Sequence, residues 1–164
     1  MSGGPRLVIE PLGAGHDRGR FACGIPALDL YLRRQAGQDI RRRIARVFVC
    51  VEADNPKQIL GFYTLSALSI ETPALPPEIA RRFPRYPLPA ALIGRLAVAE
   101  PAQGRGIGRL LLMDAIQRTL RASREIAVYA LVVDAKDERT GAFYRRFDFR
   151  SFPDRPLRLF LPLS

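Results

Sequence analysis

The chain has 164 residues, of which 48% are hydrophobic and 26% charged, a balance that excludes an intrinsically disordered chain. This length suffices for one core and one cleft but not for two ordinary domains, so we expect residues 1–164 to form a single domain. The formal net charge of +10 indicates an anionic partner, such as a nucleic acid, an acidic protein or a phosphorylated cofactor.

The first half of the chain predicts one strand, one helical region and one hairpin. Residues 6–10 predict a short edge strand. From Ile25 to about Ile44, apolar residues recur at three- and four-residue spacing, which predicts a helical region that Gly37 can divide into two. Residues 46–53 and 59–70 are rich in β-branched and aromatic residues and predict an antiparallel hairpin.

A long proline-rich segment precedes the next strand and helix. Residues 71–90 contain six prolines and no clear period, so we expect a long loop, and such loops are often functional. Residues 91–98 predict an apolar strand. Beyond residue 108, Leu112, Ile116 and Leu120 lie four apart, which predicts an amphipathic helix.

The last part of the chain predicts a buried strand, a short helix and a closing pair of strands. Residues 126–133 are almost continuously apolar, as in a strand buried on both faces. The helix is expected from Asp137 to Phe147, with Ala142, Phe143 and Phe147 facing inward, and the closing strands at 149–152 and 157–161. The alternation of strands and helices implies an α/β core.

Several classes of protein are disfavoured by what the sequence lacks. No apolar run approaches the roughly 18 residues of a membrane span, and the opening MSGGPRLVIEPLG lacks the apolar core of a secretory signal. We therefore expect a cytoplasmic protein that does not contact a membrane. His16 is the only histidine, and CxxC and HExxH motifs are absent, which disfavours metal enzymes and triad hydrolases. Cys50 is expected to be a small buried side chain, and with Cys23 it does not make a disulfide framework.

The stretch from Gln103 to Gly108, QGRGIG, carries the clearest chemical signal. It lies between a predicted strand and a predicted helix, where glycines let the backbone approach a ligand and the helix end adds a partial positive charge. This arrangement predicts a pyrophosphate-binding loop, although a tight structural turn has the same composition. A Walker loop, GxxxxGK[ST], is absent, and GxGxxG fails because Arg109 occupies the third glycine position.

The loop follows the pattern [Q/R]xxGx[G/A] and resembles the acetyl-CoA loop of the GNAT acetyltransferases. The later segment around Phe143 and Tyr144 resembles the family pattern N-x-x-A-x-x-F-Y-x-x-x-G-F. Here Asp137 stands at the Asn position, Thr140 at the Ala position and Asp148 at the Gly position. Aspartate tolerates the left-handed backbone better than most residues, so Asp148 is expected to make the turn.

A narrower resemblance covers nearly the whole chain. The strings CGIPALDLYL, IRRRIARVFV, GFYTLSALSI, LIGRLAV, VDAKDERTGAFY and RPLRLFLPL look like those of GNAT toxins from bacterial toxin–antitoxin pairs. This resemblance implies acetylation of the α-amino group of aminoacyl-tRNA, inhibition of translation, a ribbon-helix-helix antitoxin and a homodimer. The implied fold is α/β, with a mixed central sheet of six to seven strands, a splayed central pair and about four helices.

The resemblance also implies where acetyl-CoA binds. It places acetyl-CoA in the gap where the strand ending at Val98 splays from the strand at 126–133. Main-chain groups of that strand would hydrogen-bond the pantetheine arm and the acetyl carbonyl, and the loop would take the pyrophosphate. The implied cofactor-binding residues are Leu96, Ala97, Val98, Gln103, Gly104, Arg105, Gly106, Ile107, Gly108, Arg109 and Asp137.

Transfer to an amine requires a proton for the departing thiolate, and Tyr144 is the expected general acid. The alternative is an ordinary half-buried aromatic residue with its hydroxyl in solvent. Residues 91–98 contain no carboxylate or histidine to act as a base. An α-amino group has a pKa of about 7.7–8.0, whereas a lysine side chain has a pKa of about 10.4 and depends more on a base to remove its proton. The missing base therefore favours an α-amine as the acceptor.

All but two of the 26 basic residues are arginines, and the guanidinium group suits the binding of phosphate. Codon usage in a GC-rich genome explains the same bias equally well. The residues expected to bind tRNA are Arg33, Arg34, Arg41, Arg42, Arg43 and Arg85, with solvated surface positions as the alternative.

Two further functions stay open. One is a GNAT enzyme that acetylates protein N-termini or small amines, and the other is a non-catalytic module with the same fold. The positive charge disfavours a small cationic substrate, and the presence of both the Gln103–Gly108 loop and Tyr144 disfavours an inactive module.

Overall fold

The computed structural model describes residues 5–163 and divides into two compact units. The first unit contains the chain up to Leu65 together with Arg95–Ala115. The second unit contains Ser66–Gly94 together with the chain from Ile116 onward.

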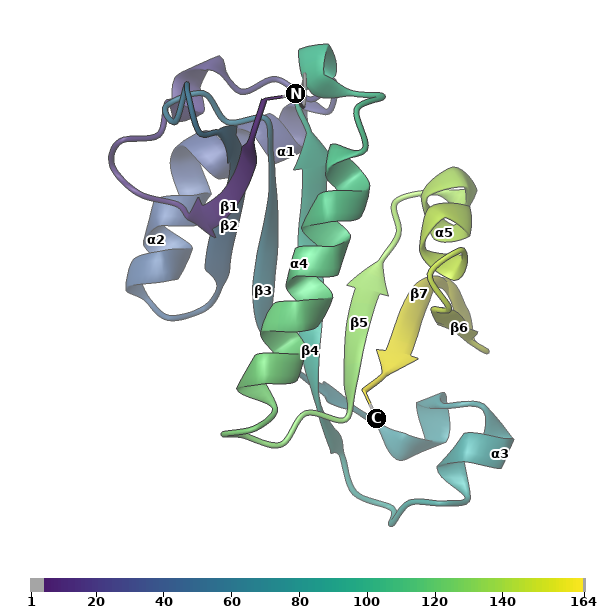
Figure 1. Ribbon diagram of the computed structural model, residues 1–164. Coiled ribbons are helices and arrows are strands. Elements are labelled where there is room, and N and C mark those ends of the chain that lie inside the picture. The colour runs from purple at the N-terminus through teal and green to yellow at the C-terminus, as the bar shows by residue number, and fades with distance from the viewer. Residues whose placement is uncertain (1–4, 164) are drawn as a thin grey trace. The chain divides into compact units, whose positions relative to one another are not determined.

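The described strands form one seven-stranded sheet in the order β1-β2-β3-β4-β5-β7-β6 (Figure 1). The strands are β1 (Leu7–Pro11), β2 (Arg46–Glu52), β3 (Gly61–Ile70), β4 (Leu88–Val98), β5 (Ala130–Asp134), β6 (Arg150–Phe152) and β7 (Arg155–Pro162). The sheet is mixed, because β4 and β5 run parallel whereas the β1–β2, β2–β3, β5–β7 and β6–β7 pairs are antiparallel. The expected α/β fold is confirmed.

The three predicted helical regions are present, and the described residues also contain a short α-helix at Pro77–Ala80 and three short 3-10 turns that were not predicted. The α-helices are α1 (Pro26–Leu30), α2 (Ala36–Arg41), α3 (Pro77–Ala80), α4 (Ile107–Ala122) and α5 (Glu138–Arg145). A π-helical turn, η2 (Tyr31–Gln35), joins α1 to α2, and the 3-10 turns are η1 (Arg18–Arg20), η3 (Thr72–Ala74) and η4 (Glu100–Ala102). The first helical region is therefore continuous from Pro26 to Arg41. Gly37 lies inside α2 and does not divide it. The interruption of the α-helix is the π-helical turn η2, which lies earlier in the chain than the expected break at Gly37.

The first unit contains the predicted hairpin and the helical region. Antiparallel β2 and β3 pair from Arg46 opposite Leu65 to Cys50 opposite Gly61. The edge strand β1 pairs with β2 and extends one residue further than expected, to include Pro11. Proline is tolerated there because an edge strand leaves one side of its backbone unpaired.

The second unit shows that residues 71–90 are not one irregular loop. They contain η3 and α3, and β4 already begins at Leu88. Leu75 and Ile79 point into an apolar core with Val132 and Phe160, which explains why this proline-rich segment is ordered. Thr72 closes the base of the segment, because its hydroxyl donates to the carbonyl oxygen of Tyr86 at 2.8 Å.

Two expectations about the last third of the chain are wrong. β5 begins at Ala130 and not at residue 126, and Ile126 is 69% exposed. On α5, the inward residues are Gly141 and Tyr144, whereas Ala142 is exposed. Gly141 faces Leu157 of β7, and a Cβ atom added there would make only an ordinary contact, at 3.6 Å, with the Leu157 side chain.

Both cysteines are free and buried, as expected for Cys50. Burial raises the pKa of each thiol from an ordinary 9.0 to about 11. Within residues 5–163, no three His, Cys, Asp or Glu side chains gather where they could hold a metal ion. No helix in the same range is long and apolar enough to cross a membrane.

Candidate active site

The loop at residues 103–106 is exposed and has the backbone of an anion-binding turn. Gly104 and Gly106 adopt left-handed φ angles of +84° and +79°, which side chains other than glycine rarely adopt. A Cβ atom at either position would meet nothing within 4 Å, so open space borders both glycines. The backbone therefore has room for a phosphate group beside it.

The helix that follows the loop provides a suitable electrostatic environment. α4 begins at Ile107, runs for 16 residues and has no acidic residue in its first turn. Its N-terminal end therefore keeps the partial positive charge of the aligned peptide dipoles. The Ile107 side chain is 1% exposed and anchors this end in the core, so only its main chain can contact a ligand. Gly108 and Arg109 continue the helix.

Gln103 holds the loop in place through its side chain. The amide nitrogen Nε2 donates to the carbonyl oxygen of Val98 at 3.1 Å and to that of Cys23 at 3.2 Å. These bonds tie the loop to the end of β4 and to the segment before α1. The glutamine of the expected motif therefore positions the loop, and its side chain is already engaged.

Arg105 is the charged residue of the loop at residues 103–106, and it has an internal partner. Its guanidinium Nη2 lies 3.2 Å from Oε1 of Glu52 at the end of β2. Both side chains are partly exposed, so this ion pair is weak and can exchange for a phosphate.

Pairing between β4 and β5 covers only part of β4. The parallel register runs from Ala90 opposite Ala130 to Ile93 opposite Val133, and β4 continues to Val98 without further partners in this register. The residues expected to bind the pantetheine arm, Leu96 to Val98, lie in this continuation. Ala97 is buried, Leu96 and Val98 are half-buried, and the carbonyl of Val98 accepts the Gln103 bond.

Asp137 is the N-cap residue of α5. Its carboxylate Oδ1 accepts a hydrogen bond from the backbone N–H of Thr140 at 2.8 Å, which is the bond of a helix N-cap. This bond holds the pKa of Asp137 below its ordinary value. At the other end of the helix, Asp148 has φ +71° and makes the expected left-handed turn.

Tyr144 lies on the inner face of α5 and is 4% exposed. Its ring packs beside Phe149 and Phe143, with centroid distances of 5.6 Å and 5.2 Å. Desolvation raises its pKa well above the ordinary value of 10. The phenol therefore stays protonated near neutral pH, as a proton donor must.

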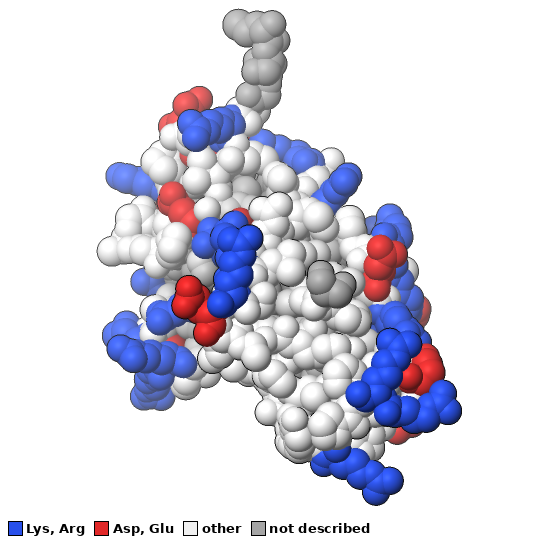
Figure 2. Space-filling model, turned by 60° about the horizontal axis from the view of Figure 1, so that its bottom comes forward, with Lys and Arg blue, Asp and Glu red and all other residues white. Residues whose placement is uncertain are grey.

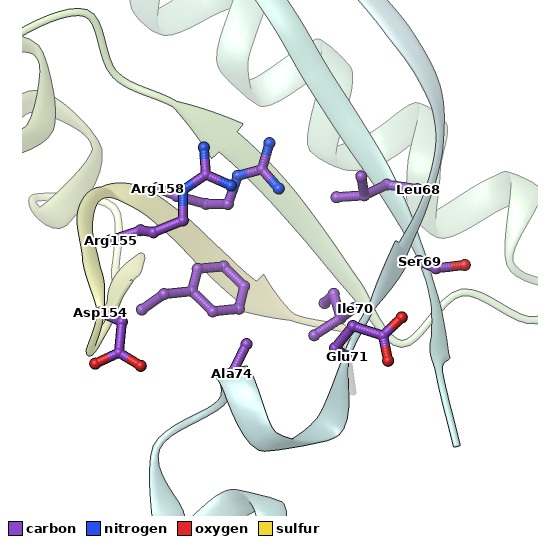
Figure 3. A pocket seen from close by; sticks show the side chains of 9 residues that line it. Leu68, Ser69, Ile70, Glu71, Ala74, Asp154, Arg155 and Arg158 are labelled. Atoms are coloured by element: carbon purple, nitrogen blue, oxygen red, sulfur yellow. The ribbon is translucent and has the colours of Figure 1, made fainter. Parts of the chain in front are cut away.

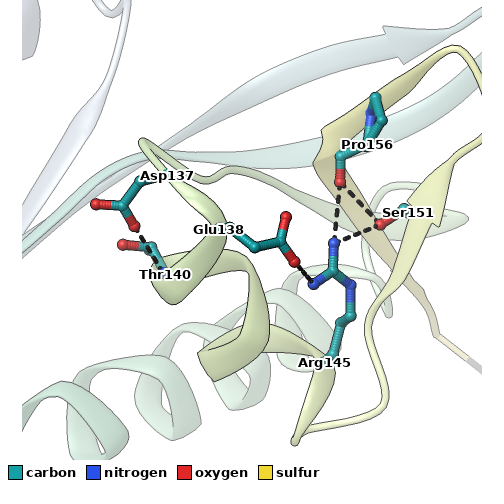
Figure 4. A network of polar contacts seen from close by, with 6 residues as sticks. All are labelled: Asp137, Glu138, Thr140, Arg145, Ser151 and Pro156. Carbon is teal, nitrogen blue, oxygen red and sulfur yellow. Dashed lines mark hydrogen bonds and ion pairs between the residues drawn. The ribbon is translucent and has the colours of Figure 1, made fainter.

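A polar network that sequence reasoning did not predict fixes α5 to the β6–β7 hairpin (Figure 4). Arg145 pairs with Glu138, two turns earlier on the same helix. Its Nη2 donates to Ser151 Oγ at 3.2 Å, and Ser151 in turn donates to the carbonyl oxygen of Pro156 at 2.8 Å. Arg145 is therefore engaged inside its unit, and it holds the helix that carries Tyr144.

The second unit also contains a cavity of about 200 Å³ (Figure 3). Leu68, Ile70 and Phe152 supply apolar walls, and Arg155 and Arg158 approach from the hairpin side. Arg158 forms two 2.7 Å bonds with the carboxylate of Asp134, which lower the pKa of that carboxyl. The cavity can take an apolar group, with positive charge at its edge.

The arginines expected to bind tRNA are all exposed, and none forms an ion pair with another described residue. Figure 2 shows one face, on which basic side chains are more numerous than acidic ones. The first unit holds Arg33, Arg34, Arg41, Arg42 and Arg43, and the second holds Arg85. Arg43 has φ +58°, so it ends the helical region in a left-handed turn.

Comparisons with known proteins agree with this geometry. Residues 43–151 match the acetyltransferase (GNAT) domain family. The chain is 38% identical over 163 residues to a tRNA-acetylating toxin from Mycobacterium tuberculosis, covering 98% of this chain and 93% of that protein. It is 31% identical over 172 residues to the probable toxin TacT from Sinorhizobium fredii, covering 99% and 94%.

Solved structures give the same result. AtaT complexed with acetyl-methionyl-tRNAfMet superposes with a TM-score of 0.88 at 31% identity, covering 96% of this chain and 95% of that chain. A tyrosine-to-phenylalanine variant of KacT superposes with a TM-score of 0.89 at 30% identity, covering 95% and 94%. The chain belongs to the GNAT acetyltransferase family. Within that family, the relatives from Mycobacterium tuberculosis and Sinorhizobium fredii are both named as toxins.

Proposed function

We propose that this protein is a toxin that transfers the acetyl group of acetyl-CoA to the α-amino group of an aminoacyl-tRNA and thereby inhibits translation. The observation that carries the proposal is the near-full-length similarity to a tRNA-acetylating toxin, at 38% identity over 98% of the chain. The complex of AtaT with acetyl-methionyl-tRNAfMet supports the same substrate class. The proposal treats residues 1–164 as one catalytic domain that acts in the cytoplasm.

The residues of the first unit bind the donor in this proposal. Backbone N–H groups of the loop from Gln103 to Gly106 and the N-terminal end of α4 hold the pyrophosphate. Arg105 and Arg109 add positive charge, and main-chain groups of Leu96 to Val98 hold the pantetheine arm and the acetyl carbonyl. The side chains of Gln103, Ile107 and Asp137 act through the fold, because each is already bonded or buried.

The chemical step joins the amine nitrogen to the acetyl carbonyl carbon and breaks the carbon–sulfur bond of the thioester. The free α-amine attacks, and Tyr144 donates its proton to the departing sulfur, whose thiol resembles that of cysteine with a pKa of about 8.5. The nitrogen releases one proton, which restores the tyrosine directly or through solvent. β4 supplies no carboxylate or histidine as a general base, and in this proposal the amine arrives largely uncharged.

The proposed partners follow the charge of the chain. The net charge of +10 suits both the tRNA acceptor stem and an acidic antitoxin segment. A tyrosine-to-phenylalanine variant of the toxin AtaT has been solved bound to the C-terminus of the antitoxin AtaR and acetyl-CoA, and a KacTA–DNA complex has also been solved. We assign a ribbon-helix-helix antitoxin and a homodimer to this chain as part of the same proposal.

The deciding experiment incubates purified protein with charged total tRNA and labelled acetyl-CoA, and then identifies the acetylated aminoacyl esters. Label on the α-amino groups of charged tRNA is expected. The matched variant is Tyr144→Phe, which removes only the hydroxyl and should reduce turnover by about 10²–10⁴-fold. Tyr86→Phe, on a side chain that is 61% exposed, is the control and should retain activity.

Label that appears only on protein lysines, protein N-termini or polyamines would reject the proposal and favour another GNAT acetyltransferase. In cells, expression of the chain alone should arrest growth, and co-expression of the antitoxin should relieve the arrest and yield a co-purified complex. Unaffected growth with Tyr144 intact would contradict the toxin assignment.

A further inference from the structure

A shallow groove of about 410 Å³ lies beside the π-helical turn in the first unit. Its walls include Leu30, Tyr31 and Arg34 from the helical region and Arg95 from β4. Leu30 is 42% exposed, so part of the wall is apolar and open to solvent. π-helical turns inside helices occur frequently at functional sites.

Arg95 is the central residue of this groove. The carbon atom at the centre of its guanidinium group lies 3.7 Å from the centroid of the Tyr31 ring. Its backbone N–H donates to Thr64 Oγ1 at 3.1 Å, so the strand under it is fixed. The guanidinium group therefore lies over the Tyr31 ring and is partly exposed.

The ring beneath Arg95 is itself rigid. The hydroxyl of Tyr31 donates to Asp39 Oδ2 at 2.8 Å, and Gln35 Nε2 donates to Asp39 Oδ1 at 2.9 Å. The Tyr31 ring also stacks with the fully buried Phe62 at a centroid distance of 6.3 Å and an interplanar angle of 13°. Tyr31 is therefore a fixed support for the guanidinium group.

The guanidinium N–H groups of Arg95 are free to donate, although the charge of Arg95 already acts on the nearby carboxylate of Asp39 and lowers its pKa. The guanidinium group forms no hydrogen bond or ion pair within residues 5–163, and no buried side-chain nitrogen in that range lacks a partner, so these N–H groups are accessible. Arg34, on the same groove, is exposed and also forms no ion pair with a described residue. Two guanidinium groups with free N–H donors beside an apolar wall suit a ligand that has both an anionic group and a flat face.

We infer that this groove binds a nucleotide of single-stranded RNA, with its base stacked on the guanidinium plane of Arg95 and its phosphate held by Arg34. Proteins that read unpaired RNA stack bases on aromatic rings or on arginine planes in this way. Arg95 directly precedes Leu96, so the groove adjoins the strand to which the acetyl group is assigned. The inference rests on the proposed function for the identity of the RNA, which is the unpaired 3′ end of the acceptor.

The test measures binding of a fluorescein-labelled RNA trinucleotide, CpCpA, by fluorescence anisotropy. Arg95→Lys keeps the charge but removes the plane, and we expect trinucleotide affinity to fall at least about tenfold. Arg124→Lys, on an exposed arginine outside the groove, is the matched control and should bind as the wild type does.

Three further readouts separate this inference from its alternatives. Acetyl-CoA affinity and thermal stability should be unchanged in Arg95→Lys, while the KM for charged tRNA should rise with little change in kcat. An Arg95→Lys variant that binds the trinucleotide as tightly as the wild type would overturn the inference, because charge alone would then suffice. A competition with an acidic peptide is the second check. If the peptide displaces the trinucleotide equally well from the wild type and from Arg95→Lys, binding depends on charge alone and the inference is overturned.

The outcomes also distinguish the groove from the proposed function. If the protein binds CpCpA through Arg95 but does not acetylate charged tRNA, the groove is supported and the proposed function fails. If charged tRNA is acetylated with the same KM by the wild type and by Arg95→Lys, the proposed function stands and the groove is rejected.

Discussion

The side-chain amide of Gln103 donates to the carbonyl oxygen of Val98 at 3.1 Å, so the loop before α4 is bonded to the end of β4. Two parts of the proposed donor site, the pyrophosphate loop and the pantetheine strand, are thereby fixed to each other within one unit. This bond makes Gln103 a positioning residue, and its removal should weaken the binding of acetyl-CoA.

Replacing Gln103 by alanine removes two hydrogen bonds, to Val98 and to Cys23. We expect the KM for acetyl-CoA to rise several-fold and the free energy of unfolding to fall by about 1–2 kcal/mol, because each bond contributes about 0.5–1.5 kcal/mol. Steady-state kinetics and urea denaturation measure the two effects. Gln38→Ala, on the exposed side of α2, is the control, and equal effects in both variants would refute the role of Gln103.

Replacing Glu52 by glutamine should free Arg105 from its ion pair. The guanidinium group then no longer has to leave the Glu52 carboxylate before it can bind a phosphate of acetyl-CoA. Acetyl-CoA should therefore bind about two- to fivefold more tightly, as expected for a partly exposed ion pair. Calorimetry measures the affinity. Arg105→Gln should remove the gain when it is combined with Glu52→Gln, and a gain that persists in the double variant would show that Arg105 is not its source.

Gly106→Val should abolish acetyl-CoA binding, because the +79° φ angle is strained for valine and its side chain would enter the open space beside the loop. Gly15→Val is the matched control. A Cβ atom at Gly15 also meets nothing within 4 Å, but Gly15 has no left-handed φ angle and lies outside the proposed site. Normal acetyl-CoA affinity in Gly106→Val would mean that the loop is only a turn.

The raised pKa of Tyr144 predicts the shape of the pH profile. The rate should increase with pH as the acceptor amine loses its proton, and it should not decline below about pH 10, because the buried phenol stays protonated there. Tyr144→Phe should keep the rising limb at a lower plateau. A wild-type decline between about pH 8 and pH 9.5 that is absent from the variant would contradict this assignment of the proton donor.

Charge reversal at Arg41, Arg42 and Arg43 should weaken tRNA binding and leave acetyl-CoA affinity unchanged, because all three are exposed at the end of the first helical region. The slope of log affinity against log salt concentration should become shallower by roughly one for each phosphate that the variant no longer neutralises. Filter binding at several salt concentrations measures the slope. Reversal at Arg121 and Arg124 is the control, and an equal change there would indicate general attraction without a defined surface.

Sequence reasoning predicted the parts of the fold that depend on local pattern. The β2–β3 hairpin, the helix after the QGRGIG loop and the left-handed turn at Asp148 are confirmed, because hydrophobic period and backbone preference are local properties. The ordered structure within residues 71–90 could not be predicted, because it depends on Leu75 and Ile79 reaching a core built by distant strands.

In the candidate site too, features set by local sequence were predictable and features set by distant contacts were not. The left-handed glycines of the loop follow from composition, whereas the engagement of Gln103 with Val98 and Cys23 depends on segments far apart in the sequence. A cap was readable at Asp137, because aspartate is favoured immediately before a helix, where its carboxylate accepts a backbone N–H from the first turn. The stack of Arg95 on Tyr31 left no local signal, because the two residues belong to a helix and a strand that are far apart along the chain.

The two buried thiols have a practical consequence for labelling the protein. Thiolates react with maleimides and iodoacetamides, and a pKa of about 11 leaves almost none at neutral pH at either Cys23 or Cys50. A cysteine introduced on the surface would therefore be the fast-reacting thiol without prior removal of the native ones. Fluorophores or spin labels placed on each of the two units in turn would then report whether the units move when acetyl-CoA or tRNA binds.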